Sequence, residues 1–374
     1  MREVNLTEKR ILQLCHGKIV PEYSSAYAMR CMRYMSLWEN RKAISVGGLI
    51  FKDRFSGKAS QFRSLLMTGI AVLRGNRSLE ILLSEGIFLR RKYSRILRNS
   101  VNESDIIVFE GPWQYYLVRE LLKNKIVIYD SHNIETILRN GNPWKSYVER
   151  LERELCNRAD LIITVSDNDR KLAQKMFDIE ESRLVCIPEG FETNCSPWSG
   201  VNSKDLVFIG SAYLPNVQAV ENIMDIAKEL PDLSFKVIGN VAHAVKKKSA
   251  PPNVYFLGTV SNEIKDRILS ESMLALNPIE IGSGRNLKIN DYVSHGVPVL
   301  TTEIGARGFN PELRENFIVS EVANFADSIR KLSDSRDRLI SISSSFMDYA
   351  KKHDYKYTQE STYKAIYEIT NKSK

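Results

Sequence analysis

The sequence lacks the long apolar segments and the cysteine patterns that would place it in a membrane or a secreted class. No apolar run approaches the roughly 18 residues that a membrane span needs, and the nearest, Leu65–Leu73, is about half that length. The first residues, MREVNLTEKR, are charged and contain no apolar signal core. The five cysteines show no C-x-x-C spacing, which argues against a disulfide framework and against a zinc site. We therefore expect a cytoplasmic protein with reduced thiols and no metal site.

Several catalytic motifs are also missing. The sequence contains no G-x-G-x-x-G after its first predicted strand and no G-x-x-x-x-G-K-[ST], which disfavours dinucleotide oxidoreductases and P-loop enzymes. It contains no H-E-x-x-H and no G-x-S-x-G. Asp167-Asn-Asp169 matches a D-x-D metal-binding motif, but Ser166 precedes it at a predicted helix start. We interpret this stretch as an N-terminal helix cap.

Positive charge is concentrated at one end of the chain. The net charge is +8, and residues 1–103 alone contain 19 Lys and Arg against 8 Asp and Glu, a net of +11. This excess points to an anionic partner, and the charge alone leaves nucleic acid, an anionic membrane surface and a phosphorylated acceptor open. The alternative is a solvated basic face with no partner. Among these partners we expect a membrane surface and no nucleic acid. In residues 87–98, basic side chains alternate with apolar ones. This segment is either an amphipathic surface touching anionic lipid or a core-packed helix with a basic solvated side. The expected location is cytoplasmic, peripheral at the inner face of the membrane.

Short β-branched runs alternate with helical patterns along the chain, which predicts an α/β protein with parallel sheets. The runs are apolar on both faces, as in strands covered by helices on both sides. The predicted strands are 10–15, 105–109, 125–129, 160–165, 205–209, 234–238, 254–257, 273–276 and 298–300. The series restarts after a Ser-, Asn-, Gly- and Pro-rich segment, Glu192–Lys204, so we predict two doubly wound domains. Their predicted limits are residues 1–195 and 204–345, and the tail, residues 346–374, is predicted to pack back on the first domain as a helix.

The segment from Gly282 onward carries the strongest chemical signal. In open parallel sheets, ligands bind at the carboxyl ends of the strands. Here a Gly-Ser-Gly turn precedes a predicted helix that ends at Gly296, and such a turn before a helix N-terminus binds anions. If the anion is a phosphate, the Lys288 side chain could also reach it. The Asp291 carboxylate could accept hydrogen bonds from ribose hydroxyls. The pattern predicts a nucleoside diphosphate site; the alternative is a capped helix with a surface Lys–Asp pair.

These motifs resemble the donor-binding half of family 4 glycosyltransferases, which have the GT-B fold. In the second half the resemblance is carried by Phe208–Ser211, Pro215-Asn216, Lys236–Gly239, Val254–Gly258, Gly282–Gly284, Leu287-Lys288, Asp291-Tyr292, Gly296, Pro298-Val299, Thr301-Thr302 and Gly305–Gly308. In the first half it is carried by Tyr129–Glu135, Arg158–Leu161, Val165–Asp167 and Ile187–Gly190. It implies two Rossmann-like domains facing each other across a cleft. It also implies transfer of a sugar, with retention, from a nucleotide-diphosphate sugar to a hydroxyl of a glycan or lipid-linked acceptor in polysaccharide biosynthesis. Neither a metal nor a bound cofactor is implied.

Site residues follow from the resemblance. The catalytic candidates are His132, near the donor sugar, with Lys288 and Arg285 at the diphosphate. The donor-binding candidates are Gly210, Ser211, Leu257, Gly258, Pro278, Gly282, Ser283, Gly284, Asn286, Leu287, Asp291 and Gly305. The acceptor-binding candidates are Tyr23, Ser24 and Ser25.

The sequence departs from the family at its paired-glutamate motif. Ser283 stands in place of the first Glu, and Asp291 in place of the second. Two alternatives stay open: a sugar-nucleotide epimerase or hydrolase on the same fold, and a catalytically weak relative that acts as a binding module at a membrane or a polyanion.

Overall fold

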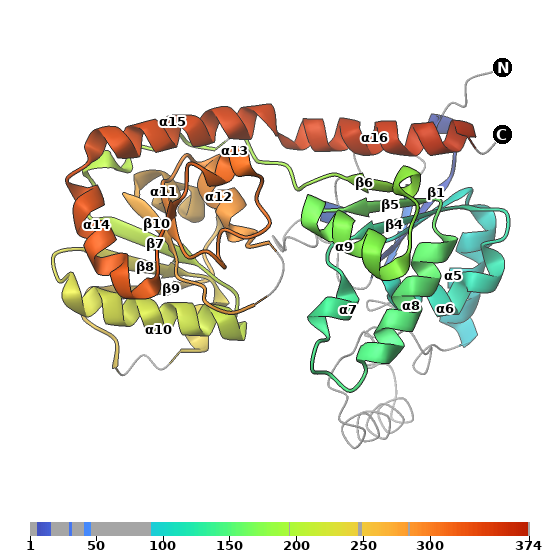
Figure 1. Ribbon diagram of the computed structural model, residues 1–374, viewed down its shortest axis with the longest axis horizontal. Helices are drawn as coiled ribbons and strands as arrows, with labels where there is room; N and C mark the ends of the chain where they lie inside the picture. Colours follow the sequence, from blue (N-terminus) through green and yellow to red (C-terminus); the bar gives the residue numbers. More distant parts are fainter. Residues whose placement is uncertain are drawn as a thin grey trace. The chain divides into compact units, whose positions relative to one another are not determined.

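The computed structural model describes residues 6–15, 30–31, 41–45, 91–193, 195–245, 249–282 and 285–372. The chain forms two compact units: unit 1 contains Met1–Glu189 together with Thr358–Lys374, and unit 2 contains Gly190–Tyr357. Each unit is built on its own six-stranded sheet with helices packed against it (Figure 1). No helix within the described ranges combines the length and the apolar character that crossing a bilayer would require.

Unit 1 is a parallel sheet with the strand order β2-β1-β3-β4-β5-β6. Its strands are β1 (Ile11–Cys15), β2 (Arg41–Ser45), β3 (Ile106–Phe109), β4 (Ile126–Ser131), β5 (Leu161–Thr164) and β6 (Leu184–Cys186). Its helices are η1 (Leu6–Glu8), α5 (Arg91–Glu103), η2 (Pro112–Gln114), α6 (Tyr115–Val118), η3 (Arg119–Leu121), α7 (Glu135–Leu138), α8 (Lys145–Arg158), α9 (Asp167–Phe177) and η4 (Glu181–Arg183), with most of α16 (Tyr355–Lys372).

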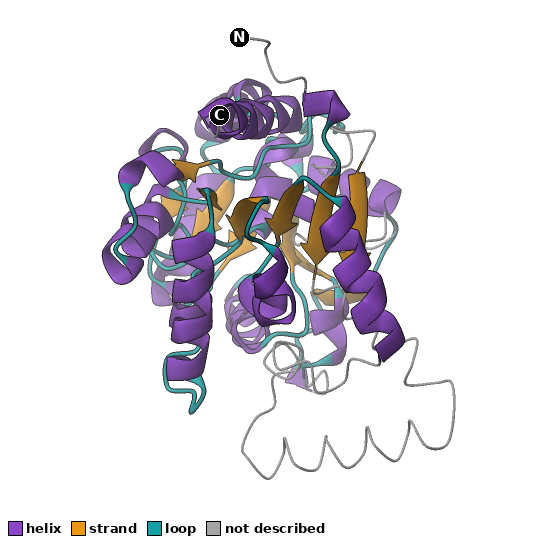
Figure 2. Ribbon diagram, turned by 90° about the vertical axis from the view of Figure 1, so that its right-hand side faces the viewer, coloured by secondary structure: helices purple, strands orange, loops and turns teal. Residues whose placement is uncertain are grey.

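The apolar runs form strands because both faces of this sheet are buried. Along β3, Ile107 and Phe109 belong to the core beneath α5 and α8, whereas Ile106 and Val108 belong to the core that contains Ile366 of α16. Figure 2 shows helices on both faces of the strands. The tail helix therefore completes the sheet of unit 1.

Unit 2 is a second parallel sheet, with the order β12-β11-β10-β7-β8-β9. Its strands are β7 (Asp205–Ile209), β8 (Ser234–Ile238), β9 (Val254–Gly258), β10 (Leu274–Asn277), β11 (Val299–Thr301) and β12 (Ile318–Val319). Its helices are η5 (Gly200–Asn202), α10 (Leu214–Glu229), η6 (Asn240–His243), α11 (Asn262–Glu271), α12 (Lys288–Ser294), α13 (Pro311–Arg314), η8 (Val322–Asn324), α14 (Phe325–Ser333) and α15 (Arg336–Lys352). The prediction of two doubly wound α/β domains is confirmed.

The units divide close to the predicted domain limits, but not at them. The expected linker, Glu192–Lys204, is bound within unit 2: the Trp198 indole Nε1 donates a hydrogen bond to the Ser272 carbonyl at 2.7 Å. The predicted tail limit at residue 346 falls inside α15, which packs on unit 2 through the buried Phe346. The return to unit 1 therefore begins at Thr358.

We predict that Ile366→Ala destabilises unit 1 by about 2–4 kcal/mol, since it removes a fully buried side chain from the α16 face of the sheet. Amide hydrogen exchange should accelerate in β3 and β4 and stay unchanged in β7 and β8. The control is Ile340→Ala, because the Ile340 side chain on α15 is exposed. Equal acceleration in both units would contradict this packing.

Candidate active site

Each sheet has one point at which the strand order reverses, and ligands of open α/β sheets bind at the carboxyl edge there. In unit 2 the chain runs from β7 outward through β8 and β9 and then returns to the other side with β10, so the reversal lies between β7 and β10. In unit 1 it lies between β1 and β3. The predicted site residues of the described chain follow strands that end at these two edges.

Glycines bring the backbone close together at the carboxyl edge of β7, β8 and β9. The Gly239 backbone N–H donates to the Gly258 carbonyl at 2.7 Å, and the Gly210 N–H donates to the Ile238 carbonyl at 2.9 Å. Gly239 has a φ of +102°, and a Cβ there would lie 2.2 Å from the Gly210 carbonyl oxygen. Backbone therefore lines this edge, with the predicted residues Gly210 and Gly258 on it.

Lys288 lies at the same edge, as the first residue of α12. Its Nζ donates a hydrogen bond to Asn216 Oδ1 at 2.6 Å and lies 4.4 Å from the centre of the Phe208 ring. The Asn216 amide in turn donates to the Ser211 carbonyl at 3.0 Å. A Cβ on Gly282 would lie 3.6 Å from Pro215 at the start of α10. The structure thus brings three predicted residues, Ser211, Gly282 and Lys288, to the N-terminus of α10.

The Lys288 amine is protonated only in part at neutral pH. The residue as a whole is half-buried, but its Nζ packs against an aromatic face and a neutral amide, and burial lowers its pKa from 10.5 to about 7. No Asp or Glu in the described part of the chain forms an ion pair with it. The position therefore offers a positive charge to an external anion.

Asp291, one turn further along α12, is already paired. Its Oδ1 accepts a hydrogen bond from Lys265 Nζ of α11 at 2.9 Å. Burial alone would lower the pKa of Lys265, but the Asp291 carboxylate together with Asp266 and Cys195 raises it. The assignment of Asp291 to ribose stays a prediction, and Lys265 is the residue that orients its carboxylate.

Arg285 and Asn286 hold the loop before α12 against the loop after β11. The Arg285 guanidinium lies 4.2 Å from the centre of the Phe309 ring and donates to Asn290 Oδ1 at 3.0 Å. The Asn286 amide donates to the Gly305 carbonyl at 3.2 Å. Arg285 and Asn286 therefore connect the loop before α12 to the loop after β11, next to α12 itself.

The other predicted donor residues lie at known places in the fold. Leu257, the residue before the last in β9, is 40% exposed. The Pro278 carbonyl accepts a hydrogen bond from Asn222 of α10 at 3.3 Å, and Leu287 immediately precedes α12. Ser283, Gly284, Tyr23, Ser24 and Ser25 lie outside the described residues.

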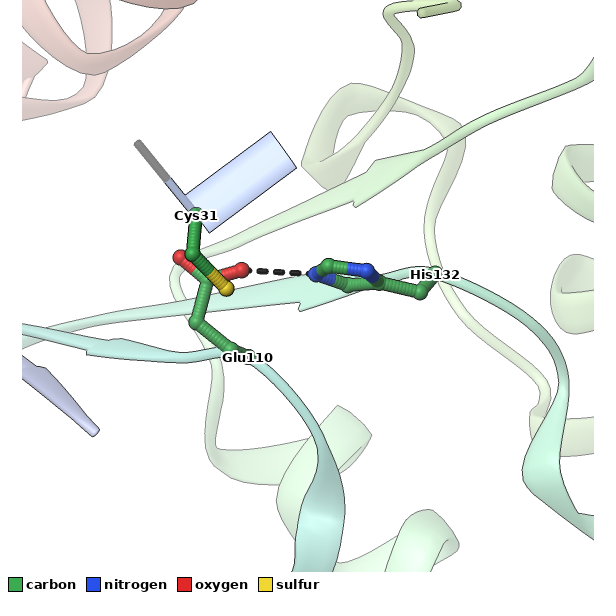
Figure 3. Close-up of side chains that lie close together, drawn as sticks. All are labelled: Cys31, Glu110 and His132. Atoms are coloured by element: carbon green, nitrogen blue, oxygen red, sulfur yellow. Dashed lines mark hydrogen bonds and ion pairs between the residues drawn. The ribbon is translucent and has the colours of Figure 1, made fainter. Parts of the chain in front are cut away.

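In unit 1, His132 follows β4 directly. Its Nε2 lies 2.7 Å from Glu110 Oε2, and Glu110 follows β3 (Figure 3). Sequence reasoning missed Glu110, although its position at a strand end is the signal that selected the residues of unit 2. Next to this pair, buried Arg30 contacts Asp130 at 2.9 Å and Glu189 at 2.9 Å.

The D-x-D stretch is a helix cap. The Asp169 backbone N–H donates to Ser166 Oγ at 3.1 Å, at the start of α9. The predicted interpretation is confirmed.

Comparisons of the sequence with protein families identify two matching segments. The family described as "Glycosyl transferases group 1" matches residues 203–335, and the family described as "Glycosyltransferase Family 4" matches residues 56–194. The chain belongs to the family 4 type of GT-B glycosyltransferases. A comparison with curated proteins finds no match.

Solved glycosyltransferases share the fold of this one. HepE from Anabaena has a TM-score of 0.68 at 13% identity, covering 96% of this chain and 99% of HepE. The trehalose-6-phosphate synthase OtsA has a TM-score of 0.65 at 14% identity, with 96% and 99% covered. TarM has a TM-score of 0.59 at 16% identity, and the match covers 73% of this chain but only 57% of TarM. At these identities the likeness shows the GT-B fold alone.

We predict a pH-dependent stability that depends on Lys288. Its pKa in the fold, about 7, lies below its ordinary value of 10.5, so between these pH values the unfolded chain binds more protons. The free energy of unfolding should rise from pH 7 to pH 9, by at most about 1.4 kcal/mol per pH unit from this group, and be lost again as pH falls to 7.

Lys288→Met removes this contribution. Denaturant unfolding of both proteins at pH 7, 8 and 9 should show the wild type gaining stability relative to the variant. Parallel profiles would contradict the lowered pKa.

Proposed function

We propose that this glycosyltransferase moves a sugar from a nucleotide-diphosphate sugar, with UDP as the nucleotide, to a hydroxyl of a glycan or lipid-linked acceptor. The Lys288 ammonium carries the proposal, since it lies at the strand-order reversal of unit 2 without an acidic partner among the described side chains. A diphosphate matches this charge and the backbone-lined edge beside it. UDP is supported by the fold neighbours HepE, TarM and the pneumococcal GtfA, which have been solved with UDP.

Lys288 would stabilise the departing diphosphate. A bound diphosphate raises the pKa of a neighbouring lysine, because opposite charge favours the ammonium form. As the bond from the sugar to the phosphate oxygen breaks, negative charge grows on that oxygen. The ammonium then interacts more strongly with the transition state than with the bound donor, which is the condition for catalysis.

The proposed reaction retains the anomeric configuration and needs no resident metal or cofactor. Lys288, with Arg285 in the adjacent loop, supplies the positive charge at the diphosphate. The acceptor hydroxyl attacks on the face from which the diphosphate departs: its O–H proton passes to the leaving phosphate oxygen as the new C–O bond forms. We expect EDTA to leave the rate of transfer unchanged. The product should keep the anomeric configuration of the donor sugar.

The basic charge of α5 is the basis for a proposed membrane contact. On α5, Leu97 and Val101 are buried in the core of unit 1, whereas Ile96 is 37% exposed, so packing covers most of the apolar side of the helix. Arg95 and Arg98 are exposed. We propose that α5 attracts an anionic membrane surface by charge rather than by insertion, which would place the enzyme peripherally at the inner face of the membrane in polysaccharide biosynthesis.

Thermal stabilisation by UDP, GDP and their sugars tests the donor site. A ligand at 100 times its dissociation constant adds about 2.7 kcal/mol, so UDP and a UDP-sugar should raise the melting temperature. No shift with any nucleotide would reject the donor site and favour the binding-module alternative. Product analysis with and without an acceptor then separates a transferase from an epimerase or hydrolase.

Lys288→Ala should lower kcat/KM for transfer by roughly 30- to 900-fold, equivalent to about 2–4 kcal/mol, because it removes one preorganised charge at the leaving group. The matched control is Lys228→Ala: Lys228 is an exposed lysine on α10 that pairs with nearby Asp225. Unchanged turnover in Lys288→Ala would show that the phosphate assignment is wrong.

A further inference from the structure

Three side chains of the types that bind transition metals in proteins meet at the carboxyl edge of unit 1. Glu110 directly follows β3, His132 directly follows β4, and Cys31 comes from an earlier segment of the same unit. The cysteine sulfur, a glutamate oxygen and a histidine nitrogen all lie within 4.8 Å of one another. Figure 3 shows the His132 ring directed at the Glu110 carboxylate, with the Cys31 side chain beside it. The group is complete within unit 1.

The group is buried, unlike the clusters of acidic side chains that are common on protein surfaces. Cys31 is fully buried, the Glu110 side chain is buried, and the His132 side chain is 13% exposed. Among the described side chains, Gln13 and His132 hydrogen-bond to the Glu110 carboxylate, and no Lys or Arg pairs with it. Burying a carboxylate is costly unless positive charge or hydrogen bonds compensate. A cation beside Glu110 would supply that charge.

The types of ligand atom select the metal. A thiolate and an imidazole favour zinc and similar transition metals, whereas magnesium and calcium prefer oxygen ligands alone. Zinc binds its ligands tetrahedrally at about 2.0–2.3 Å, which places the ligand atoms roughly 3–4 Å from one another. The observed spacing brackets this range: Glu110 Oε2 lies 2.7 Å from His132 Nε2, and no pair in the group exceeds 4.8 Å.

Gln13, a buried residue of the central strand β1, supports two of the three ligands. Its Nε2 donates a hydrogen bond to the Cys31 carbonyl at 2.9 Å and another to Glu110 Oε1. Oε1 is therefore held by the amide, and Oε2 is the oxygen that faces His132. Carboxylates that bind metals are commonly held by such a hydrogen bond from a neighbouring side chain.

We propose that unit 1 binds one zinc ion through Cys31 Sγ, Glu110 Oε2 and His132 Nε2, with Gln13 orienting Glu110. The ion replaces the protons through which a thiol, a carboxylate and an imidazole form hydrogen bonds, so the site does not require any of the three to be without a partner. Structural zinc sites have four protein ligands. This site has three, so zinc should exchange with the solution and be taken up when it is supplied. Its binding does not depend on the proposed transfer, for which no metal is needed.

The sequence argued against a zinc site only through the spacing of its cysteines. Here the three ligands come from separate segments, so no short motif contains them. They meet because β3 pairs with β4 in the sheet, which places the residues that follow these strands at one edge. Gln13 lies on β1, the other neighbour of β3.

Zinc uptake by the full chain tests the proposal. Equilibrium dialysis against zinc chloride, followed by metal analysis, should find one zinc ion per wild-type chain and none in Cys31→Ala. X-ray absorption of the zinc-loaded wild type should show one sulfur ligand at about 2.3 Å and nitrogen or oxygen ligands at about 2.0–2.1 Å. No uptake by the wild type would overturn the proposal and leave Glu110 and His132 as a hydrogen-bonded pair only. A bound zinc ion without a sulfur ligand would also overturn it.

Two further variants separate the site from general damage to the fold. Cys156→Ala is the matched control, because Cys156 is a buried cysteine of unit 1, on α8, outside the group. It should bind zinc as the wild type does, and an equal loss in Cys31→Ala and Cys156→Ala would overturn the assignment. Gln13→Leu keeps all three ligands but removes the hydrogen bond to Glu110, so the affinity for zinc should fall about 10- to 100-fold.

Cobalt provides a measurement that needs no variant. Cobalt(II) occupies zinc sites, and a thiolate ligand gives it an intense charge-transfer absorption in the near ultraviolet. The cobalt-loaded wild type should show this band, and zinc should remove it by displacing the cobalt. Absence of the band in the folded wild type would overturn the proposal, even if Cys31→Ala proves too unstable to purify.

Discussion

The desolvated ammonium of Lys288 constrains the arrangement around the carboxyl edge of unit 2. Asp291, the acidic residue one turn away on the same helix, pairs with Lys265 instead, and a neutral amide receives the Lys288 hydrogen bond. Unit 1 sorts its buried charges in a similar way. Arg30 neutralises Asp130 and Glu189, which leaves Glu110 to His132. In both units, an ionisable side chain near the reversal of strand order forms its hydrogen bond with a side chain from a different element of the fold.

The sequence predicts most of the fold because the central strands are buried on both faces. Runs such as Ile106–Phe109 are apolar at every position, since alternate residues enter different cores. The missed strands are β2, β6 and β12, which have five, three and two residues. All three are edge strands, and β2 begins with Arg41-Lys42. Short strands with one neighbour give little periodic signal, so only the assembled sheet identifies them.

The candidate site is predictable where its residues are close in sequence. The glycine turn and Lys288 form one contiguous pattern, and the chemistry of that pattern points to an anion. Lys288 and Asn216, however, are 72 positions apart, and Glu110 and His132 are 22 apart. Such pairs form only when separate strands end at one edge, and residue types alone do not say which side chains will meet there. Glu110 could still have been predicted from the sequence, because it directly follows a strongly predicted strand.

The return of α16 to unit 1 has a consequence for synthesis on the ribosome. Ile366 enters the core of unit 1, yet Thr358 and the residues after it are translated only after the whole of unit 2. One face of the first sheet, including Ile106 and Val108, must therefore wait uncovered while unit 2 emerges and folds. The first sheet can thus form early in translation, but α16 packs on it only after unit 2 has been translated. Until then, a chaperone would bind the apolar face that α16 later covers.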